Sequence, residues 1–521
     1  MKVLRYVALA VAILFVLTVA RLATLEKGGP AHDDVMLEGG IPATFYLPGA
    51  GNPFFDLTSS PQAQRPPGVV LVHGFSADRE TMSTLARWIA QNGYAVLAID
   101  LRGHGANRNP FDNGFARPSL RPDVKAAVDF MRQSDRVDGS KIIVMGHSMG
   151  SGAVLDYAEN DPNLQGAVMI SGGWSLGAQR AKNALFIFAQ NDPEFIRSLS
   201  IAIATQWSGV PQIELGKTYG DFAQGTAVEA VQVAGVNHVQ IITSKDAATT
   251  IVKWLDSAFG MPRTADIRLS DPRQRLARIA GILFLILLIP IGRTAGWIAT
   301  EWAERPAGAD GWIGLAILAG ALLIVMPLVA NDPPASFLSL VIGDAEVSWL
   351  GAAGIVTIAV LLIWGRLEWV RFGGSTLPTL LAAGLAFPAI YICQNAYSVT
   401  FHRLAMTPER LIAWILAAAM MLPFWLGFEF LVRRGGMVMS TVLGSLGRVI
   451  IIVAIFVGVS VGIFSGVLFL IIPIIVLEFV GLEVVAASAY STSRNLFLIA
   501  LIESAWFAAL LAGTNPITFM L

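Results

Sequence analysis

The sequence predicts a mixed α/β domain followed by a bundle of membrane-spanning helices. The chain has 521 residues, of which 55% are hydrophobic and only 14% are charged, so it is too apolar for an ordinary all-soluble enzyme. The charged residues are unevenly spread, because 22 Asp, Glu, Lys and Arg lie in residues 279–521 and the other 51 lie in residues 1–278. The first part alternates short apolar runs with helical patterns, whereas the second repeats long apolar runs.

Residues 1–25 are predicted to form a signal anchor, which is a single N-terminal transmembrane helix. Lys2 and Arg5 precede an uncharged run from Val7 to Ala20, and Arg21 follows it. Cations before a short apolar core are typical of a signal peptide or an uncleaved anchor. Both flanking arginines can extend their guanidinium groups toward lipid headgroups, which favours the anchor over a cleaved signal peptide.

Residues 35–260 are predicted to form the α/β domain, with a mostly parallel sheet and helices on both faces. Its short apolar runs are nearly continuous and are separated by Gly, Pro, Asn and Asp, as expected for strands buried on both faces. The predicted strands are 68–72, 95–99, 141–145, 167–170, 185–189 and 229–233, and the predicted helices include 79–91, 121–133, 150–159 and 195–207.

The rest of the chain predicts a juxtamembrane linker, 261–278, and a transmembrane helical domain, 279–521. A helix needs about 20 residues to cross a bilayer core, and most of the apolar runs reach this length. The run 449–480 contains Gly462 and Pro473, so it predicts either one tilted helix or a tight pair, which gives seven or eight spans. The runs lie near 279–297, 311–330, 347–365, 377–394, 411–432, 449–480 and 495–513.

The arginines of the transmembrane domain predict its orientation. Loops are numbered in chain order, and odd loops carry more arginines than even loops. The odd loops hold Arg293, Arg305, Arg366, Arg371, Arg433, Arg434 and Arg448, and the even loops hold Arg403, Arg410 and Arg494, of which Arg494 joins the odd loops if the run 449–480 is a pair of helices. Under the positive-inside rule the odd loops are cytoplasmic, so we expect a multi-pass cell membrane protein with its α/β domain on the extracytoplasmic side. The arginine-rich linker 261–278 opposes this orientation.

Ser148 lies in the strongest local motif of the chain. The pentapeptide Gly146-His147-Ser148-Met149-Gly150 follows an apolar strand pattern and precedes a helical one. This is the G-x-S-x-G nucleophile elbow, in which a serine occupies a strained strand-to-helix turn. The two glycines leave room for neighbouring backbone to approach. The motif predicts a nucleophilic serine hydroxyl above the edge of the sheet.

With this motif, residues 35–260 resemble the α/β-hydrolase family of serine esterases and lipases. Segment 69–75 ends in His-Gly-Phe and segment 94–105 ends in Asp-Leu-Arg-Gly-His-Gly, and both are similar to segments of that family. The resemblance implies an oxyanion hole formed by the backbone amides of Phe75 and Met149. The order of anchor, lipase-like domain and polytopic bundle is also similar to that of the glycosylphosphatidylinositol inositol-deacylase family, a similarity of layout only.

A serine nucleophile needs a base to take its proton and an acid to orient that base. In this fold the chain order is serine, acid, histidine. Asp192 follows the predicted strand 185–189 and fits the position of the acid. We favour it over Glu194, which lies two residues further into the turn, and over Asp161, which follows a helix.

His238 is the next histidine after that acid, and it follows the predicted strand 229–233. The later His402 falls in the transmembrane domain. Because the carboxyl ends of parallel strands meet at one edge, the sequence predicts that Ser148, His238 and Asp192 form a catalytic triad there.

Composition and spacing give no support to several other classes of function. A net charge of −1 offers no clustered cations for nucleic acid. The single cysteine, Cys393, cannot form an internal disulfide. We expect no metal and no cofactor, because the histidines show no ligand spacing. Protein partners are unknown.

The sequence therefore predicts a membrane-embedded serine hydrolase that cleaves an ester, thioester or lipid acyl bond through an acyl-enzyme. Its expected partners are the lipid bilayer and a lipid-like acyl ester. Residues 171–183 are too few for a helical lid, so Gly172, Gly173 and Trp174 are expected to shape an open acyl pocket that suits a long-chain ester. A serine peptidase with the same triad and a non-catalytic membrane binding or transport protein remain alternatives. Glu503, near the middle of its apolar run, is expected to face the bundle.

Overall fold

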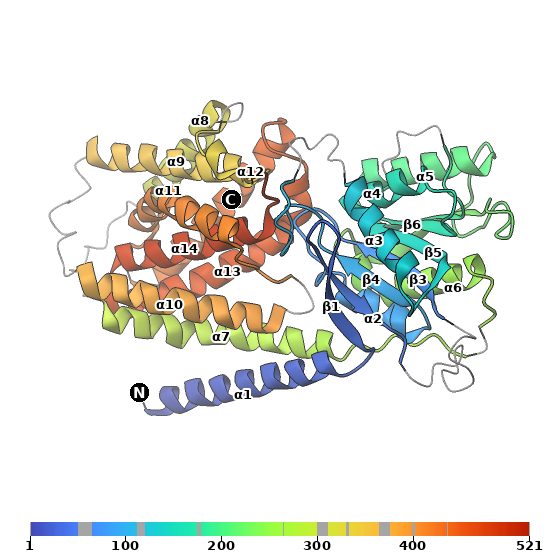
Figure 1. The fold of residues 1–521 in the computed structure, drawn as a ribbon. Coiled ribbons are helices and arrows are strands. Elements are labelled where there is room, and N and C mark those ends of the chain that lie inside the picture. Colours follow the sequence, from blue (N-terminus) through green and yellow to red (C-terminus); the bar gives the residue numbers. More distant parts are fainter. Residues whose placement is uncertain are drawn as a thin grey trace.

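The computed structural model describes residues 2–49, 65–111, 120–173, 179–263, 265–299, 311–329, 333–363, 376–398, 402–434 and 436–519. The α/β domain lies at one end of the molecule and the long helices lie at the other (Figure 1). Helix α1 (Lys2–Lys27) runs alongside α7 (Arg273–Ile298), and its N-terminus points away from the α/β domain.

An eight-stranded sheet forms the centre of the α/β domain, with the strand order β1-β2-β4-β3-β5-β6-β7-β8. The strands are β1 (His32–Leu37), β2 (Ile41–Tyr46), β3 (Pro67–Val72), β4 (Ala95–Ile99), β5 (Asp138–His147), β6 (Gly166–Ile170), β7 (Ala184–Asn191) and β8 (Val228–Asn237). β2 pairs antiparallel with β1 and β4, and the strands from β4 to β8 pair in parallel. The loops that follow these parallel strands therefore meet at one edge of the sheet.

Helices cover both faces of the sheet because successive strand residues point to opposite sides. In β3, Val69 and Leu71 pack in the same apolar cluster as α2 and α6, whereas Val70 and Val72 pack with α3, α4 and α5. These helices are α2 (Ser83–Gln91), α3 (Arg121–Gln133), α4 (Met149–Ala158), α5 (Glu194–Ser208) and α6 (Lys245–Ala258), with the short 3₁₀ helix η1 (Gln240–Thr243) before α6. The predicted fold class is confirmed.

The β1–β2 hairpin was not predicted from the sequence. β1 begins His-Asp-Asp and has only one buried residue, Leu37, so its pattern is not that of a buried strand. The predicted helix 79–91 was also too long, because residues 79–82 form turns and α2 begins at Ser83.

Nine helices within the described ranges are long and apolar enough to cross a membrane, which indicates a membrane-associated protein. They are α1, α7, α8 (Gly311–Val329), α9 (Gly343–Ile363), α10 (Thr376–Tyr397), α11 (Pro408–Val432), α12 (Met437–Ser460), α13 (Val467–Ser493) and α14 (Leu496–Thr514). The ambiguous run 449–480 is divided between α12 and α13, and the chain turns between them at Gly462, where φ is +78°.

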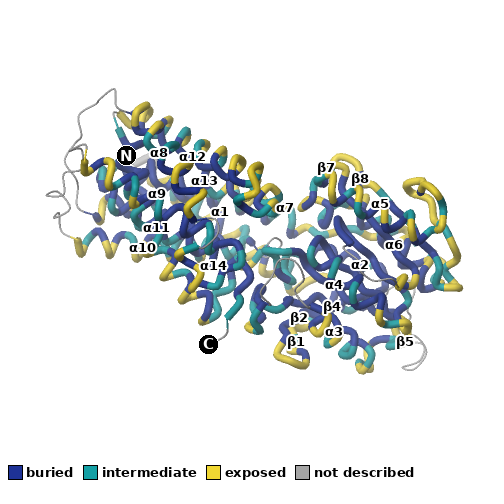
Figure 2. The backbone as a smooth tube through the Cα atoms, turned by 90° about the horizontal axis from the view of Figure 1, so that it is seen from above, coloured by how far each residue is buried: buried dark blue, intermediate teal, exposed yellow. Residues whose placement is uncertain are grey.

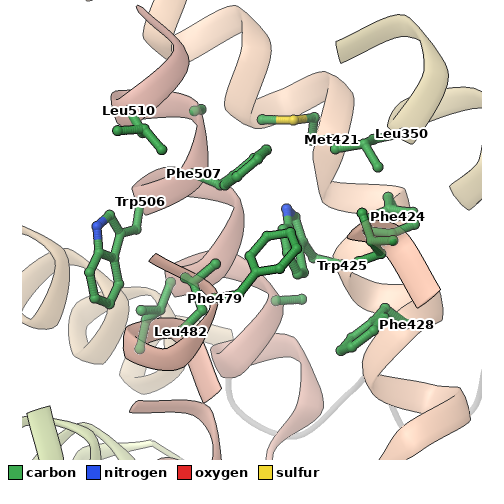
Figure 3. Packing of buried hydrophobic residues seen from close by; sticks show 14 of the residues in the cluster. Leu350, Met421, Phe424, Trp425, Phe428, Phe479, Leu482, Trp506, Phe507 and Leu510 are labelled. Atoms are coloured by element: carbon green, nitrogen blue, oxygen red, sulfur yellow. The ribbon is translucent and has the colours of Figure 1, made fainter. Parts of the chain in front are cut away.

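Helices α7 to α14, which we call the bundle, pack around aromatic side chains. The ring of Trp425 on α11 lies 5.7 Å from that of Phe428 and 5.8 Å from that of Phe507, edge to face. Figure 3 shows these rings interleaved with Phe479 of α13. Large apolar side chains such as Leu328 and Ile363 remain exposed on the outside, where Figure 2 shows yellow and teal patches along the helices. An apolar interior with an apolar outer surface is what a lipid environment requires.

Five charged side chains form a buried network inside the bundle. Arg433 donates to Glu429 at 2.7 Å and to Glu483 at 2.6 Å, and Arg448 donates to Glu483 and Glu503. Glu503 therefore faces the bundle, as expected.

Three of the arginines assigned to loops lie within helices instead, Arg293 in α7, Arg410 in α11 and Arg448 in α12. Because α12 and α13 are separate helices, Arg494 belongs to an odd loop. Arg433 follows α11, and its side chain is buried.

The segment after α14 returns to the α/β domain. The Ile517 amide donates to the carbonyl of Gly103 at 3.0 Å, and the Phe111 amide donates to the carbonyl of Ile517 at 2.8 Å. Ile517 also forms an antiparallel bridge with Leu340, which precedes α9. The loop after β4 is thus hydrogen-bonded directly to the bundle end of the chain.

Candidate active site

Ser148 occupies a sharp turn between β5, which ends at His147, and α4, which begins at Met149. Its φ of 51° and ψ of −119° are unusual for a residue with a Cβ atom, and such a conformation costs about 1–3 kcal/mol. Neighbouring backbone fills the space on both sides. A Cβ atom on Gly146 would lie 2.2 Å from the Gly150 carbonyl oxygen, and one on Gly150 would lie 2.4 Å from that of His73. The turn therefore requires both glycines.

The three residues of the predicted triad form one chain of hydrogen bonds. His238 Nδ1 lies 2.6 Å from Asp192 Oδ1, and His238 Nε2 lies 2.9 Å from Ser148 Oγ. An ionised carboxylate only accepts hydrogen bonds, so Nδ1 carries the proton and Nε2 is free to accept the serine proton. The three residues follow β5, β7 and β8, and all are buried. The arrangement can transfer a proton away from the serine hydroxyl.

Asp192 is held in its ionised form. Burial alone would raise the pKa of its carboxyl, but the hydrogen bond and charge of His238, the Ser171 hydroxyl and the Ala189 amide together lower the pKa below its usual value. Ser171 Oγ donates to Oδ2 at 2.6 Å, and the Ala189 amide donates to the same oxygen at 2.7 Å. Ser171 was not predicted to contact the candidate acid, although it directly follows β6 at the same edge of the sheet.

The two alternative acids lie in other environments. Glu194 is exposed and pairs with Arg197 in the first turn of α5. Asp161 lies after α4, pairs with Arg132 at 2.9 Å and accepts a hydrogen bond from Tyr157 at 2.7 Å. The carboxylate that contacts His238 is that of Asp192.

His147 contacts the backbone and the ring of His238, the candidate base. Its Nε2 lies 2.9 Å from the backbone oxygen of His238, and the two rings are 4.9 Å apart. Burial, together with the nearby His238, lowers the pKa of His147 to about 3. The His147 imidazole is therefore neutral at working pH, and its Nε2–H can donate to that oxygen.

This depressed pKa makes the α/β domain sensitive to acid. Below pH 6.5 an unfolded His147 binds a proton, whereas the folded one binds it only near pH 3, so stability should fall as the pH drops through this window. The loss from this residue is at most about 1.4 kcal/mol per pH unit. Thermal melting of full-length protein at pH 7.5 and 5.5 would measure it. His147→Gln should show a smaller difference between the two pH values, and equal differences would contradict this role.

The two proposed oxyanion donors lie beside the elbow. Met149 is the first residue of α4, and a helix N-terminus favours negative charge. Gly74, just before Phe75, touches the elbow, because a Cβ atom there would lie 3.1 Å from Ser148 Cβ and 3.0 Å from His147 Nδ1. The peptide that links Gly74 to Phe75 is thus adjacent to the serine.

The charged side chains of the loop after β4 make structural hydrogen bonds and ion pairs. Asp100 accepts hydrogen bonds from the amides of Arg79 at 2.8 Å and Ala106 at 2.9 Å, and Arg102 pairs with Asp123 at 2.9 Å.

Trp174, one of the residues expected to shape the acyl pocket, lies outside the described residues. Among those that are described, no group of three or more His, Cys, Asp or Glu side chains is arranged to hold a metal ion.

The sheet order, the elbow and the loops at its carboxyl edge give the α/β part of the chain an α/β-hydrolase fold. Residues 64–217 match the family model described as serine aminopeptidase, S33. Cutinase est1 of Thermobifida alba is 28% identical over 135 residues, which is 25% of this chain and 38% of that protein. The bis(hydroxyethyl) terephthalate hydrolase of Streptomyces coelicolor is 32% identical over 113 residues, which is 21% of this chain and 33% of that protein.

The chain spans about a third of the length of these curated relatives. Among solved structures, a membrane phospholipase A described as a bacterial virulence factor is 13% identical with a TM-score of 0.32, over 49% of this chain and 97% of that one. A thermophilic esterase from Thermogutta terrifontis is 14% identical with a TM-score of 0.31, over 44% of this chain and 99% of that one.

Proposed function

We propose that this protein is a membrane-bound serine hydrolase that cleaves acyl esters. The observation that carries the proposal is the continuous hydrogen-bonded chain from Ser148 through His238 to Asp192. The carboxylate keeps its usual ionised form, the imidazole has the tautomer a base requires, and the serine stands on a strained elbow. This combination is what nucleophilic acyl transfer needs.

The reaction proceeds in two halves. His238 Nε2 removes the Ser148 proton as Oγ attacks the acyl carbonyl carbon, and the carbonyl π electrons move to oxygen. The amides of Phe75 and Met149 stabilise this oxyanion, and each such donor is worth about 10²–10³ in kcat. The oxyanion then collapses, the leaving alcohol takes the proton from His238, and Ser148 keeps the acyl group. Water, deprotonated by His238, releases the acid by the same steps.

An ester is favoured over a peptide by the names of the relatives, which include cutinases and a terephthalate ester hydrolase. The family model, described as an aminopeptidase, favours a peptide, so a serine peptidase remains the second candidate. The proposed substrate is a long-chain or lipid-like ester, because the Phe75 side chain packs against the apolar cluster of the bundle. An acyl chain could then remain in an apolar environment while its carbonyl reaches Ser148.

We also propose that the α/β domain lies on the extracytoplasmic side. By position in the chain, the odd loops hold Arg305, Arg366, Arg371, Arg433, Arg434 and Arg494, and the even loops hold Arg403, so the positive-inside rule still favours this orientation. Two of the linker arginines that oppose this orientation are neutralised by pairing, Arg263 with Asp256 at 2.7 Å and Arg273 with Asp271 at 2.6 Å.

Labelling with a fluorophosphonate probe tests the function. The probe should attach to Ser148 in full-length protein, as peptide mapping would show, and Ser148→Ala should remain unlabelled. The same preparation should hydrolyse long-acyl esters faster than acetyl esters and faster than peptide amides. Absence of labelling in folded protein would favour the non-catalytic alternative, and faster turnover of peptides would favour the peptidase.

A further inference from the structure

The turn that follows β3 and carries Phe75 is held from the bundle side. Asp78 in this turn accepts hydrogen bonds from the amide and the hydroxyl of Thr81, both at 2.9 Å through Oδ1. Its other oxygen, Oδ2, accepts from the backbone amide of Arg403 at 3.0 Å and lies 3.3 Å from His402 Nδ1. His402 and Arg403 belong to the segment between α10 and α11. One carboxylate thus joins the turn to the bundle.

The Asp78 carboxylate is suited to this role because it is buried yet ionised. Burial alone would raise its pKa, but the adjacent His402 and the amides of Thr81 and Arg403 lower the pKa below its ordinary value. A buried carboxylate with both oxygens hydrogen-bonded resists displacement, since losing a partner leaves an unsatisfied charge.

A second connection reaches Phe75 through the loop after β4. Arg410, at the start of α11, is buried and donates to the carbonyls of Gly103 at 2.7 Å and Gly105 at 3.2 Å. Between these glycines, His104 places its ring 5.9 Å from that of Phe75, edge to face. On its other side Arg410 donates to the carbonyls of Ala512, Gly513 and Asn515.

We infer that the bundle is required for the full catalytic rate, because His402, Arg403 and Arg410 position the turn that carries the Phe75 oxyanion donor. This inference rests on the proposed function. Arg403 acts through Asp78 and Arg410 acts through His104, so both are positioning residues rather than catalytic ones.

The physical consequence is a selective effect on the transition state. An oxyanion donor contributes only when it lies within hydrogen-bond distance of the oxygen that becomes charged. A displacement of about 1 Å can cost as much as 10²-fold in rate. The ground-state substrate depends far less on this amide, so loss of the support should lower kcat and leave KM nearly unchanged.

Two substitutions at one position isolate the connecting hydrogen bond. Arg403→Pro removes the amide that binds Asp78, whereas Arg403→Ala keeps it and removes only the side chain. In full-length protein, Arg403→Pro should lower kcat at least about 10-fold relative to Arg403→Ala, with KM within about threefold. A trifluoromethyl ketone that mimics the tetrahedral adduct should bind more weakly by a similar factor. Equal kcat values for the two variants would overturn the inference.

Expressing kcat per active site separates positioning from misfolding. A fluorophosphonate probe counts competent Ser148 sites, so a variant that merely folds poorly has fewer sites but an unchanged kcat per site, and that result would also overturn the inference. If Arg403→Pro yields no folded protein, Asp78→Ala serves as the second variant. It should lower kcat per site, and Asp78→Asn, which keeps an acceptor oxygen, should recover part of it.

The Ser148→Ala variant keeps this test separate from the proposed function. If Ser148→Ala hydrolyses esters as wild type does, the proposed function itself is wrong. If Ser148→Ala is inactive while Arg403→Pro matches Arg403→Ala, the hydrolase stands and only the role of the bundle is wrong.

Discussion

Replacing Ser148 with alanine is expected to lower kcat for ester hydrolysis by at least about 10⁴-fold, the largest effect of any single substitution in this chain. The reason is that the acyl-enzyme cannot form without Oγ, and only oxyanion stabilisation and binding remain. Asp192→Asn should cost a comparable factor, because an amide in place of the carboxylate favours the wrong tautomer of His238. Steady-state kinetics of the purified full-length protein would measure both losses.

The alternative acids provide matched controls for Asp192. Glu194→Gln and Asp161→Asn make the same chemical change at carboxylates that pair with Arg197 and Arg132 instead of His238. Both variants should keep kcat within about twofold of wild type, because each carboxylate is paired with an arginine outside the triad. A large loss in Glu194→Gln together with an active Asp192→Asn would reassign the acid to Glu194.

Removal of one arginine from the charged network of the bundle should be the second large effect, this time on stability. Arg433→Met leaves Glu429 and Glu483 buried without their shared guanidinium group. Breaking a buried ion pair from one side costs about 3–5 kcal/mol. Thermal unfolding of the detergent-solubilised protein, followed by loss of the monodisperse species, should show a clearly lower midpoint.

Two further variants test the cause of that loss. Arg293→Met removes a half-buried arginine of α7 whose side chain donates to Ser491 at 3.3 Å, so it should cost less than about 1 kcal/mol. Adding Glu429→Met to Arg433→Met removes the carboxylate that has lost its hydrogen-bonded arginine, since Glu483 still accepts from Arg448, and should recover part of the stability. If the double variant is less stable than Arg433→Met, unpaired charge is not the source of the loss.

Local patterns were enough to predict the central part of the fold and the candidate triad. Strands buried on both faces must be apolar along their length, and a nucleophile elbow needs glycines on either side of Ser148. Chain order and the ends of strands then led to Asp192 and His238, and the side chains do lie within hydrogen-bond distance. Their catalytic role remains a prediction.

Contacts that do not follow from chain order or from the ends of strands could not be predicted in this way. The single buried residue of β1, the Ser171 hydroxyl at Asp192 and the Arg403 amide at Asp78 depend on how the elements pack. The partner of Glu503 could not be predicted from the sequence for a related reason. A lone charge in an apolar run requires a partner, but only the packing of α12 against its neighbours identifies it as Arg448.

The hydrogen bonds between Ile517 and the loop after β4 have a consequence for the order of biogenesis. Domains generally fold in the sequence in which the ribosome delivers them. The α/β domain is therefore translated well before Ile517 emerges, and during that interval the Gly103 and Phe111 backbone groups lack this neighbour. Maturation of the α/β domain should await synthesis of α14, so nascent chains arrested before that helix would carry an immature α/β domain.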